Sequence, residues 1–420
     1  MRLAFFLLCG VLLLFGCTQP PVSTPTPTSI ISASPTPAAS ISPTDSSLAG
    51  SVNQFAFDFY AQLTESEDGN IFYSPFSASQ AFSILYEGAA GNTASELEAV
   101  FGFEKDAGKR RSSVSVANGR LNEPNSEYSL SLANALWIQK DFPILNSYTS
   151  VVKDYYGGDS SNLDFIGDPV SSADTINDWA FEKTNGRIPS VLVPEMITPD
   201  LRLVITNAIY FKGKWLQEFD KAKTRDMEFR VSPQEKIQVP MMYSNGEEAG
   251  FRYMDNDVLQ MLELPYKGDA LSMLVLLPKN DDITALESEI DASKLDDWKK
   301  ELASRQVEVY LPKFKMETDY DLTAPLKKMG ASDVFTPYEA DLSGIDGAKD
   351  LFVSFALQKA FVEVNEEGTE AAAVTVIGIG ITSVREGPPV FKADHPFLFL
   401  IQEKTTGAVL FMGRVSNPLA

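Results

Sequence analysis

The sequence contains few of the residues on which most catalytic and metal sites depend. It has two cysteines, Cys9 and Cys17, and one histidine, His395, in 420 residues. A zinc site built from thiolates, or any site that needs two histidines, is therefore excluded by counting. The motifs GxSxG, HExxH, GxxxxGK[ST] and CxxC are absent as well. We expect no metal and no cofactor.

Basic residues are also scarce. Lysine and arginine number 35 against 57 aspartates and glutamates, which gives a formal net charge of −22. Such a protein repels phosphate backbones, so no nucleic-acid partner is expected. The composition does not exclude a hydrolase that uses a pair of catalytic carboxylates. His395 precedes Pro396 and a strongly apolar run, and we expect it to be a packed residue at the start of a strand.

A long apolar run follows Arg2 near the N-terminus and extends to Phe15, within residues 1–17. The run is too short for a comfortable membrane span and ends in Leu14-Phe15-Gly16-Cys17. This ending resembles a bacterial lipobox, which implies a signal peptide over 1–16 and a lipid anchor on Cys17. A plain secretory signal is the alternative. Both interpretations place the protein outside the cytoplasm, secreted or held at the cell surface, with membrane contact only through the lipid.

The next segment, residues 18–47, is rich in proline, serine and threonine and almost uncharged. It cannot bury enough apolar area to offset the entropy of ordering, so it is predicted to be a linker. The rest, 48–420, shows no further low-complexity break and is predicted to be one domain. Val52, Phe55, Phe59 and Leu63 have helical spacing, and Ser77 is a candidate cap for the helix after it.

Strand-like segments dominate beyond residue 200. They are rich in β-branched and aromatic residues and are bounded by glycine, proline and asparagine. These segments are 201–211, 259–266, 271–278, 307–314, 396–403 and 407–415. Helices early and long strands late predict an α+β fold with large sheets.

One segment lacks charge in an otherwise acidic chain. After the acidic turn at Glu366, Glu367 and Gly368, no charged residue occurs from Ala371 to Val384. We expect the chain to leave its sheet at this turn and cross the surface. An exposed uncharged strand is normally an aggregation hazard, unless the segment is held ready to enter a sheet. A plain hydrophobic hairpin or an interface strand is the alternative.

The body of the chain resembles the serpins, from about 53 to 418. The resemblance is carried by the order and spacing of short motifs, among them NIFYSPFSASQAF (70–82), TNAIYFKGKW (206–215), LELPYKGDALSMLVLLP (262–278), EEGTEAAA (366–373) and HPFLFLIQEKTTGAVLFMGRVSNP (395–418). It implies a serpin fold of three β-sheets with about eight or nine helices and an exposed reactive-centre loop.

The resemblance also implies a function. Inhibitory serpins trap serine proteases, and some cysteine proteases, as a covalent acyl-enzyme when the cleaved loop inserts into the central sheet. The implied hinge comprises Glu366, Glu367, Gly368, Thr369, Glu370, Ala371, Ala372 and Ala373. The segment 369–387 contains no proline, which fits insertion as a central strand. A monomer that is not an enzyme is expected. A non-inhibitory serpin that acts as a surface binding protein is the alternative.

The family's usual spacing from the hinge places the cleaved bond at Thr382-Ser383. A shorter loop type points instead to Arg385-Glu386. Thr382 suits a protease with a small apolar pocket, either elastase-like or subtilisin-like, whereas Arg385 suits a trypsin-like protease.

The resemblance places further residues in the central sheet. Those implied to control its opening are Ser74, Ser77, Asn207 and Gln358, and Trp215 is implied to lie at the breach, where insertion begins. Serpins usually have a histidine at the position of Gln358. Glutamine offers donors and an acceptor but does not titrate, so we expect sheet opening to be insensitive to pH between about 5 and 8.

Overall fold

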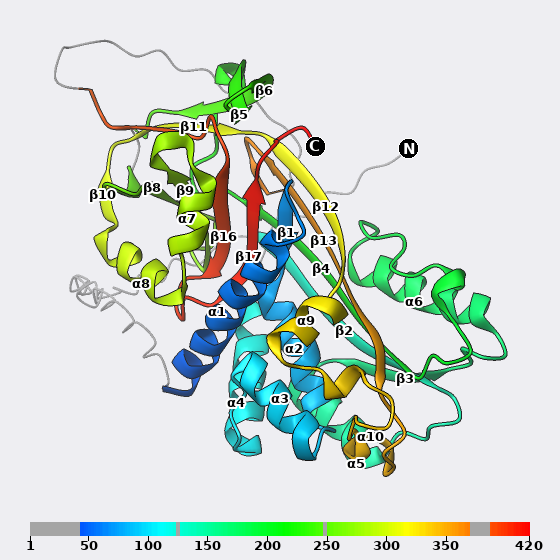
Figure 1. Cartoon of the computed structure of the whole chain (residues 1–420). Coiled ribbons are helices and arrows are strands. Elements are labelled where there is room, and N and C mark those ends of the chain that lie inside the picture. Colours follow the sequence, from blue (N-terminus) through cyan, green and yellow to red (C-terminus); the bar gives the residue numbers. More distant parts are fainter. Residues whose placement is uncertain (1–42, 123–126, 247–249, 370–386) are drawn as a thin grey trace, which may run out of the picture. The chain divides into compact units, whose positions relative to one another are not determined.

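The computed structural model describes residues 43–122, 127–246, 250–369 and 387–420, which all belong to one compact unit, 41–420. Three β-sheets and ten α-helices occur in these residues (Figure 1), in agreement with the α+β class predicted from the sequence. The expected number of helices, eight or nine, is slightly lower than this, because several of the ten are very short, such as α10 with four residues. In the described part of the chain, no helix is long and apolar enough to cross a bilayer.

The helices have the following bounds: α1 Pro43–Thr64, α2 Pro75–Tyr86, α3 Gly91–Phe101, α4 Ala107–Leu121, α5 Asn146–Val151, α6 Pro169–Lys183, α7 Ile283–Glu289, α8 Ala292–Glu301, α9 Thr323–Met329 and α10 Ser343–Asp346. A π-helical turn η1 (Val152–Tyr156) follows α5, and a 3-10 turn η3 (Lys221–Lys223) follows β4. Helix α1 begins within the segment 18–47, so the predicted boundary at 48 falls inside a helix.

The six-stranded sheet, called the main sheet below, has the order β12-β13-β14-β4-β2-β3. Its strands are β12 Phe314–Asp321, β13 Val353–Asn365, β14 Gly368–Thr369, β4 Leu203–Lys214, β2 Tyr128–Gln139 and β3 Asp159–Leu163. Strands β13 and β4 run parallel and pair directly, from Val353 opposite Leu203 to Phe361 opposite Tyr210. We call this boundary the seam.

The other two sheets lie beside the main sheet (Figure 1). The seven-stranded sheet has the order β1-β17-β16-β9-β8-β7-β10, with β1 Ile71–Tyr73, β17 Val409–Val415, β16 Phe397–Glu403, β9 Leu271–Pro278, β8 Leu259–Pro265, β7 Phe251–Asp255 and β10 Ala303–Arg305. The four-stranded sheet has the order β15-β11-β6-β5, with β15 Val390–Lys392, β11 Glu308–Pro312, β6 Glu235–Ser244 and β5 Arg225–Ser232.

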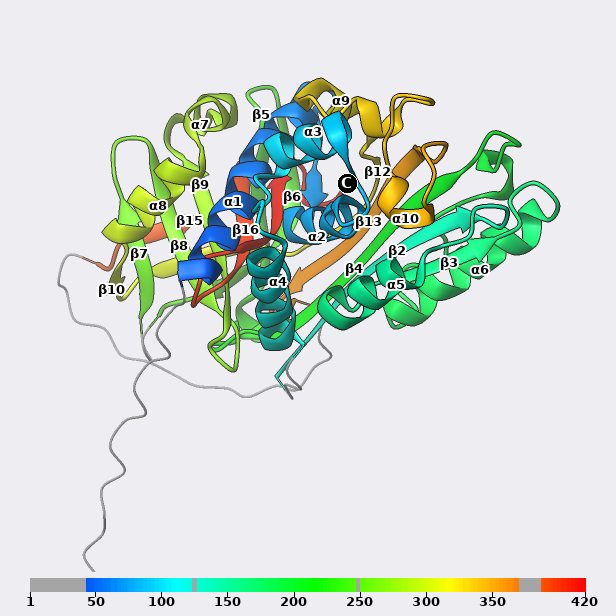
Figure 2. The same cartoon turned by 90° about the horizontal axis from the view of Figure 1, so that it is seen from below.

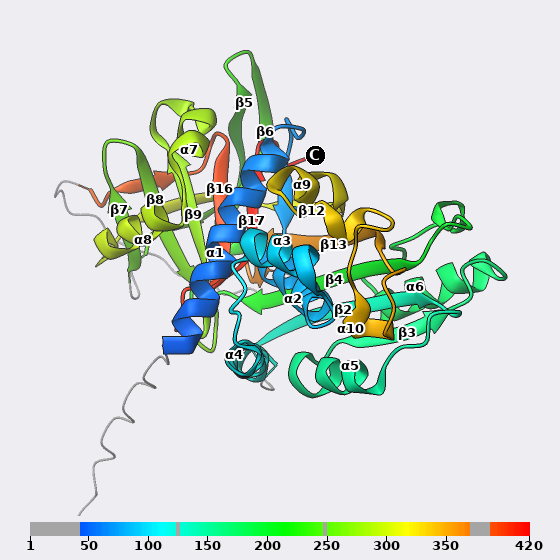
Figure 3. The same cartoon turned by 60° about the horizontal axis from the view of Figure 1, so that its bottom comes forward.

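The main sheet is covered on both faces, by α2 on one and α6 on the other (Figures 1 and 2). Successive residues of a strand point to opposite faces, and β2 shows the consequence. Its Leu136 belongs to the cluster that contains α2, whereas its Trp137 belongs to the cluster that contains α6. Figure 3 shows α1, α2, α3 and α4 grouped on the first of these sides. Burial on both faces explains why β4 is apolar over most of its length without alternation.

Two local predictions from the sequence need correction. Helix α2 is capped by Ser74, whose side chain accepts a hydrogen bond from the Ser77 backbone N–H, so Ser77 is not the cap. Pro75 at the first helical position explains the shift, since proline is favoured there and lacks the N–H that an earlier turn would need. The run 307–314 is not one strand. It splits at Lys313 between β11 and β12, which belong to different sheets.

Candidate functional site

The turn after β13 brings the predicted hinge back into the main sheet. Gly368 pairs with Asn365 on one side and Lys214 on the other, and Thr369 pairs with Val364 and Gly213. Two further residues after the acidic turn thus form the short strand β14 between β13 and β4. The uncharged run from Ala371, which we expect to leave the sheet and cross the surface, lies outside the described residues.

Only glycine fits at position 368. Its φ is +153°, and a Cβ built on it would lie 2.0 Å from the carbonyl oxygen of Gly213. No side chain can occupy that space without moving the backbone of β4. The turn can therefore be this tight because glycine allows two main chains to approach so closely.

Two aromatic residues hold the end of the seam where β14 lies. Trp215 is fully buried and stacks on Tyr266 at 4.6 Å between ring centroids. Its indole N–H donates to the carbonyl oxygen of Asn365 at 2.9 Å, and its backbone N–H donates to that of Glu367, also at 2.9 Å. The Tyr266 hydroxyl lies 2.8 Å from that of Thr369. We call these residues, with the turn 365–369, the head of the seam.

The middle of the seam contains a network of neutral polar groups. The side-chain oxygen of Gln358 accepts from the Ser74 backbone N–H at 2.8 Å. Its amide nitrogen donates to the Ser74 carbonyl at 3.0 Å and to the Asn207 side-chain oxygen at 2.7 Å. All three residues are at most 1% exposed. Gln358 thus uses both its donors and its acceptor to join β13, β4 and the start of α2.

Asn207 extends this network beyond the seam. Its amide nitrogen donates to the Ser77 hydroxyl and to the side-chain oxygen of Asn134 on β2. The four residues that the resemblance assigned to sheet opening therefore lie together, and the structure adds Asn134. We call Ser74, Ser77, Asn134, Asn207 and Gln358 the central network.

Comparison with known proteins agrees with this geometry. The family model described as serpin (serine protease inhibitor) matches residues 50–418. The chain belongs to the serpin family. An uncharacterized serpin-like protein of Methanosarcina acetivorans is 39% identical over 99% of this chain and 98% of its own length. The leukocyte elastase inhibitor of Xenopus tropicalis is 40% identical over 88% of this chain and 99% of its own.

The fold comparison gives the same result. The crystal structure of Serpin48 from the insect Tenebrio molitor, described as a highly specific serpin, superposes with a TM-score of 0.80. It is 35% identical in sequence and covers 89% of this chain and 98% of its own. The serpin fold predicted from the motifs is confirmed.

The two hinge glutamates of this serpin are buried and paired, although the sequence showed only an acidic turn. Glu366 lies 2.9 Å from the Lys313 ammonium and accepts a hydrogen bond from Thr224 at 2.8 Å. Burial raises the pKa of Glu366, but the hydrogen bonds from Lys313 and Thr224 outweigh burial and hold the pKa below its ordinary value. Glu367 is paired with Lys221 of η3.

Sequence reasoning missed these partners for understandable reasons. Lys313, Lys221 and Thr224 lie far from the hinge in sequence, and nothing in their local patterns marks them. Tyr266 could have been predicted, because it belongs to the motif LELPYKGDALSMLVLLP, which helped to identify the family. Asn134 had no such signal, since a polar residue in a strand is more often exposed.

Several predicted site residues of this serpin lie outside the described residues. They are Cys17, Glu370, Ala371, Ala372, Ala373, Thr382, Ser383, Arg385 and Glu386. The described chain stops at Thr369 in the head of the seam and resumes at Gly387, just before β15.

The one histidine of this serpin is a packed residue, as predicted. His395 is 7% exposed, and its Nε2 donates to the carbonyl oxygen of Pro278 at 2.9 Å. Its Nδ1 lies 3.0 Å from a carboxylate oxygen of Asp394. Burial raises the pKa of Asp394, but hydrogen bonds from His395 and Lys392 lower it to about 2. The histidine thus lies just before β16, beside the ion pairs that Asp394 forms with Arg230 and Lys392.

Proposed function

We propose that this serpin is an irreversible, suicide-type inhibitor of serine proteases, with some cysteine proteases as further targets, and that it has no enzymatic activity. The observation that carries the proposal is the seam. Strands β4 and β13 pair directly along most of their length, and Thr369 already lies between them at one end. In this proposal the protease forms an acyl-enzyme with the loop after Thr369, and the freed segment then continues β14 down the seam.

The composition of that segment supports insertion. Residues 371–384 are uncharged, and the alternate set Ala371, Ala373, Thr375, Ile377 and Ile379 would face one side of the sheet. Insertion would add main-chain hydrogen bonds and bury that set. A charge at one of these positions would be buried without a partner, at a cost of about 2 kcal/mol or more.

We propose Thr382-Ser383 as the cleaved bond and an elastase-like or subtilisin-like protease as the target. Thr382 suits a small apolar specificity pocket. The relatives named leukocyte elastase inhibitor, about 40% identical, support the elastase-like class. Arg385-Glu386, with a trypsin-like target, is the alternative bond. The complex would contain one monomer of the serpin and one protease.

We further propose that Cys17 is lipidated and that 18–47 tethers the inhibitor outside the cytoplasm. The lipobox-like sequence before Cys17 supports this proposal. Metabolic labelling with a fatty acid, in a bacterial host that processes lipoproteins, should label the chain. The Cys17→Ser variant should stay unlabelled. Equal labelling of both would contradict the anchor.

The decisive experiment for inhibition uses residues 41–420 and a panel of elastase-, subtilisin-, chymotrypsin- and trypsin-like proteases. We expect a band near the summed mass that survives denaturing electrophoresis, and a released peptide that begins at Ser383 by mass spectrometry. Ala373→Arg should be cleaved without forming this band, because the charge blocks insertion. The matched control Ala303→Arg, on the exposed edge strand β10, should inhibit normally.

Heat stability gives a second measurement. The cleaved inhibitor should unfold at a markedly higher temperature than the intact protein, because insertion releases a metastable state. Cleavage by every protease, with no covalent band and no gain in heat stability, would contradict inhibition. That outcome would favour a non-inhibitory serpin that acts as a surface binding protein.

A further inference from the structure

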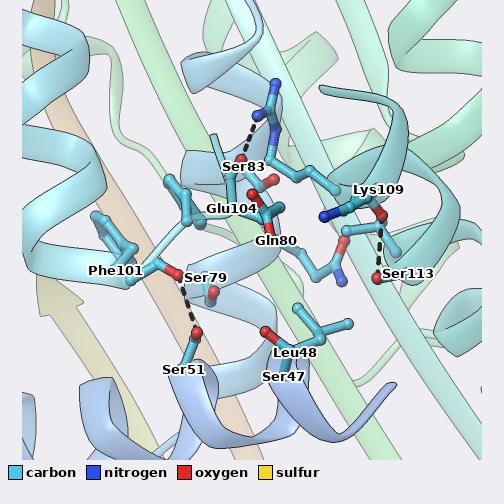
Figure 4. Close-up of a pocket in the computed structure, with 14 residues that line it drawn as sticks. Ser47, Leu48, Ser51, Ser79, Gln80, Ser83, Phe101, Glu104, Lys109 and Ser113 are labelled. Atoms are coloured by element: carbon cyan, nitrogen blue, oxygen red, sulfur yellow. Dashed lines mark hydrogen bonds between the residues drawn. The ribbon is translucent and has the colours of Figure 1, made fainter. Parts of the chain in front are cut away.

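A hollow of about 570 Å³ lies in the four-stranded sheet, at the end where η3 leads into β5. Seven residues of η3, β5, β6 and β11 line it: two cations, two methionines, two tyrosines and one aspartate. The hollow between α1, α2, α3 and α4 in Figure 4 has only about 40 Å³, enough for a few water molecules. The first hollow, called the sheet pocket below, is large enough to receive side chains of another protein.

The sheet pocket is connected to both ends of the segment that the target protease would cleave. On the hinge side, Thr224 follows the lining residue Lys223 and donates a hydrogen bond to Glu366 at 2.8 Å. On the other side, the lining residue Tyr310 of β11 lies opposite Lys392 of β15, the first strand after the segment. A protease bound between these two ends would therefore lie close to the sheet pocket.

The two cations of the sheet pocket have no counter-ion. Neither Lys223 nor Arg225 forms an ion pair with any residue that the structure describes, whereas the neighbouring Lys221 is paired with Glu367. The Lys223 ammonium lies 5.7 Å from the centroid of the Tyr243 ring, a cation–π contact that leaves its charge in place. Arg225 is exposed. In a chain with a net charge of −22, this pocket is a local reversal of sign.

The one aspartate among the lining residues does not neutralise these cations. Asp226 pairs with Pro240 of β6, whereas its neighbour Arg225 pairs with Met241. Because successive residues of a strand point to opposite faces, the Asp226 side chain points away from the face that carries Arg225 and Met241. The charges on the face of the sheet pocket are therefore those of the two cations.

The wall of the sheet pocket is aromatic. Tyr243 and Tyr310 are neighbours across β6 and β11, with ring centroids 4.9 Å apart, and both are half-buried. Met241 beside them is only 1% exposed. Tyrosine and arginine are the residue types that contribute most to binding at protein interfaces, because they combine a broad contact surface with polar groups. The sheet pocket thus suits a protein surface that presents an acidic side chain.

We propose that the sheet pocket is a second contact site for the target protease, and that it receives an acidic side chain from the protease surface beside the active-site cleft. The carboxylate would meet Lys223 and Arg225, and the surface around it would pack on Tyr243 and Tyr310. Charges placed in this way raise the rate of encounter more than they change the steps that follow. This inference rests on the proposed function, because it concerns the same protease.

The test is the second-order rate constant of inhibition, measured with the full chain for each protease of the panel that forms the covalent complex. The double variant Lys223→Met, Arg225→Met should react about tenfold more slowly with at least one of these proteases at low salt. High salt should reduce the difference, because salt screens the attraction. The yield of covalent complex per cleaved inhibitor should equal that of the parent, because neither residue lies in the seam.

A second double variant, Lys153→Met, Lys294→Met, is the matched control. It removes the same charge from two exposed lysines of η1 and α8 that form no ion pair with the described residues, and it should react like the parent. The inference is wrong if every protease that forms the complex reacts equally fast with both double variants, or if the loss is the same at low and high salt. If the parent forms no complex, the proposed function fails, and kcat/KM for cleavage of the segment then tests the contact by the same comparison.

Discussion

The head and the middle of the seam are both buried, yet they are held by different kinds of interaction. At the head, an aromatic stack and two ion pairs fix the turn that leads into β14. In the middle, the central network consists of amides and hydroxyls, with no ionisable side chain among its five residues. The cations at the head are partly exposed, with 29% of the Lys221 side chain and 37% of the Lys313 side chain accessible.

This difference indicates that the two parts of the seam differ in how easily their interactions are broken. Ion pairs with a partly exposed partner are weakened by solvent and salt, so they can be exchanged at modest cost. A buried neutral network loses several hydrogen bonds at once when it opens and is indifferent to salt. If the loop inserts as proposed, insertion begins at the weaker end and must then displace the stronger middle.

The largest effect is expected in the central network. Gln358→Leu would leave the Ser74 N–H and the Asn207 side-chain oxygen without a partner, whereas the Ser74 carbonyl still accepts from Ala78. Two buried unpaired groups should lower the free energy of unfolding by about 2–4 kcal/mol. Urea unfolding measures the change. Gln234→Leu, at an exposed position, is the control and should differ by less than about 0.5 kcal/mol.

A smaller effect is expected at the turn. Gly368→Ala should expel β14 from between β13 and β4, because the new methyl group would overlap the Gly213 carbonyl. We expect a loss of about 1–3 kcal/mol and a change in Trp215 fluorescence, since the indole bonds to the same turn. Gly387→Ala has open space around it and should change neither property. An unchanged Trp215 signal in Gly368→Ala would show that the turn does not hold the head.

The ion pairs at the head should matter less. Lys313→Met removes the cation from the buried Glu366 carboxylate and should cost about 1 kcal/mol, because the lysine is partly exposed. Lys328→Met removes an exposed partner from Glu65 and should cost less than about 0.5 kcal/mol. When unfolding is measured at low and at high salt, the loss in Lys313→Met should be smaller at high salt, because salt screens the ion pair. A salt-independent loss would place the contribution of Lys313 in packing rather than charge.

The last effect, no larger than that of Lys313→Met, depends on pH. The pKa of Glu366 lies below its ordinary value of 4.5, so its charge stabilises the fold above that pH, and this contribution disappears as the pH falls through the lowered value. The difference in stability between the parent and Glu366→Gln should be constant from pH 6 to 8, at about 1 kcal/mol, and should shrink below about pH 4. The central network should show no such dependence, and neither should sheet opening between about pH 5 and 8.

Local patterns in the sequence predicted the elements better than their junctions. The helical spacing of Val52, Phe55, Phe59 and Leu63 is confirmed, since all four side chains are buried in α1. The break at Lys313 escaped prediction because both halves of the run have strand-like composition, and only sheet membership separates them. The same limit applies to the start of β14.

The candidate site could be predicted only through the family resemblance. Ser74, Ser77, Asn207 and Gln358 are scattered over the sequence, and no periodicity connects them. Their motifs indicated a shared role, but the motifs did not include Asn134, or the lysines that neutralise Glu366 and Glu367. These partners are chosen by distance in space, which composition does not encode.

The sequence by itself determined the net charge of −22, the exclusion of thiolate zinc sites and of sites that need two histidines, the α+β class and the uncharged segment after the hinge. Each depends on counts or short-range patterns, which physical chemistry translates directly. Only the tertiary structure decided that the hinge glutamates are buried and that Gly368 touches β4. Each of these depends on which strands and helices approach one another, and burial turns that approach into a requirement for pairing.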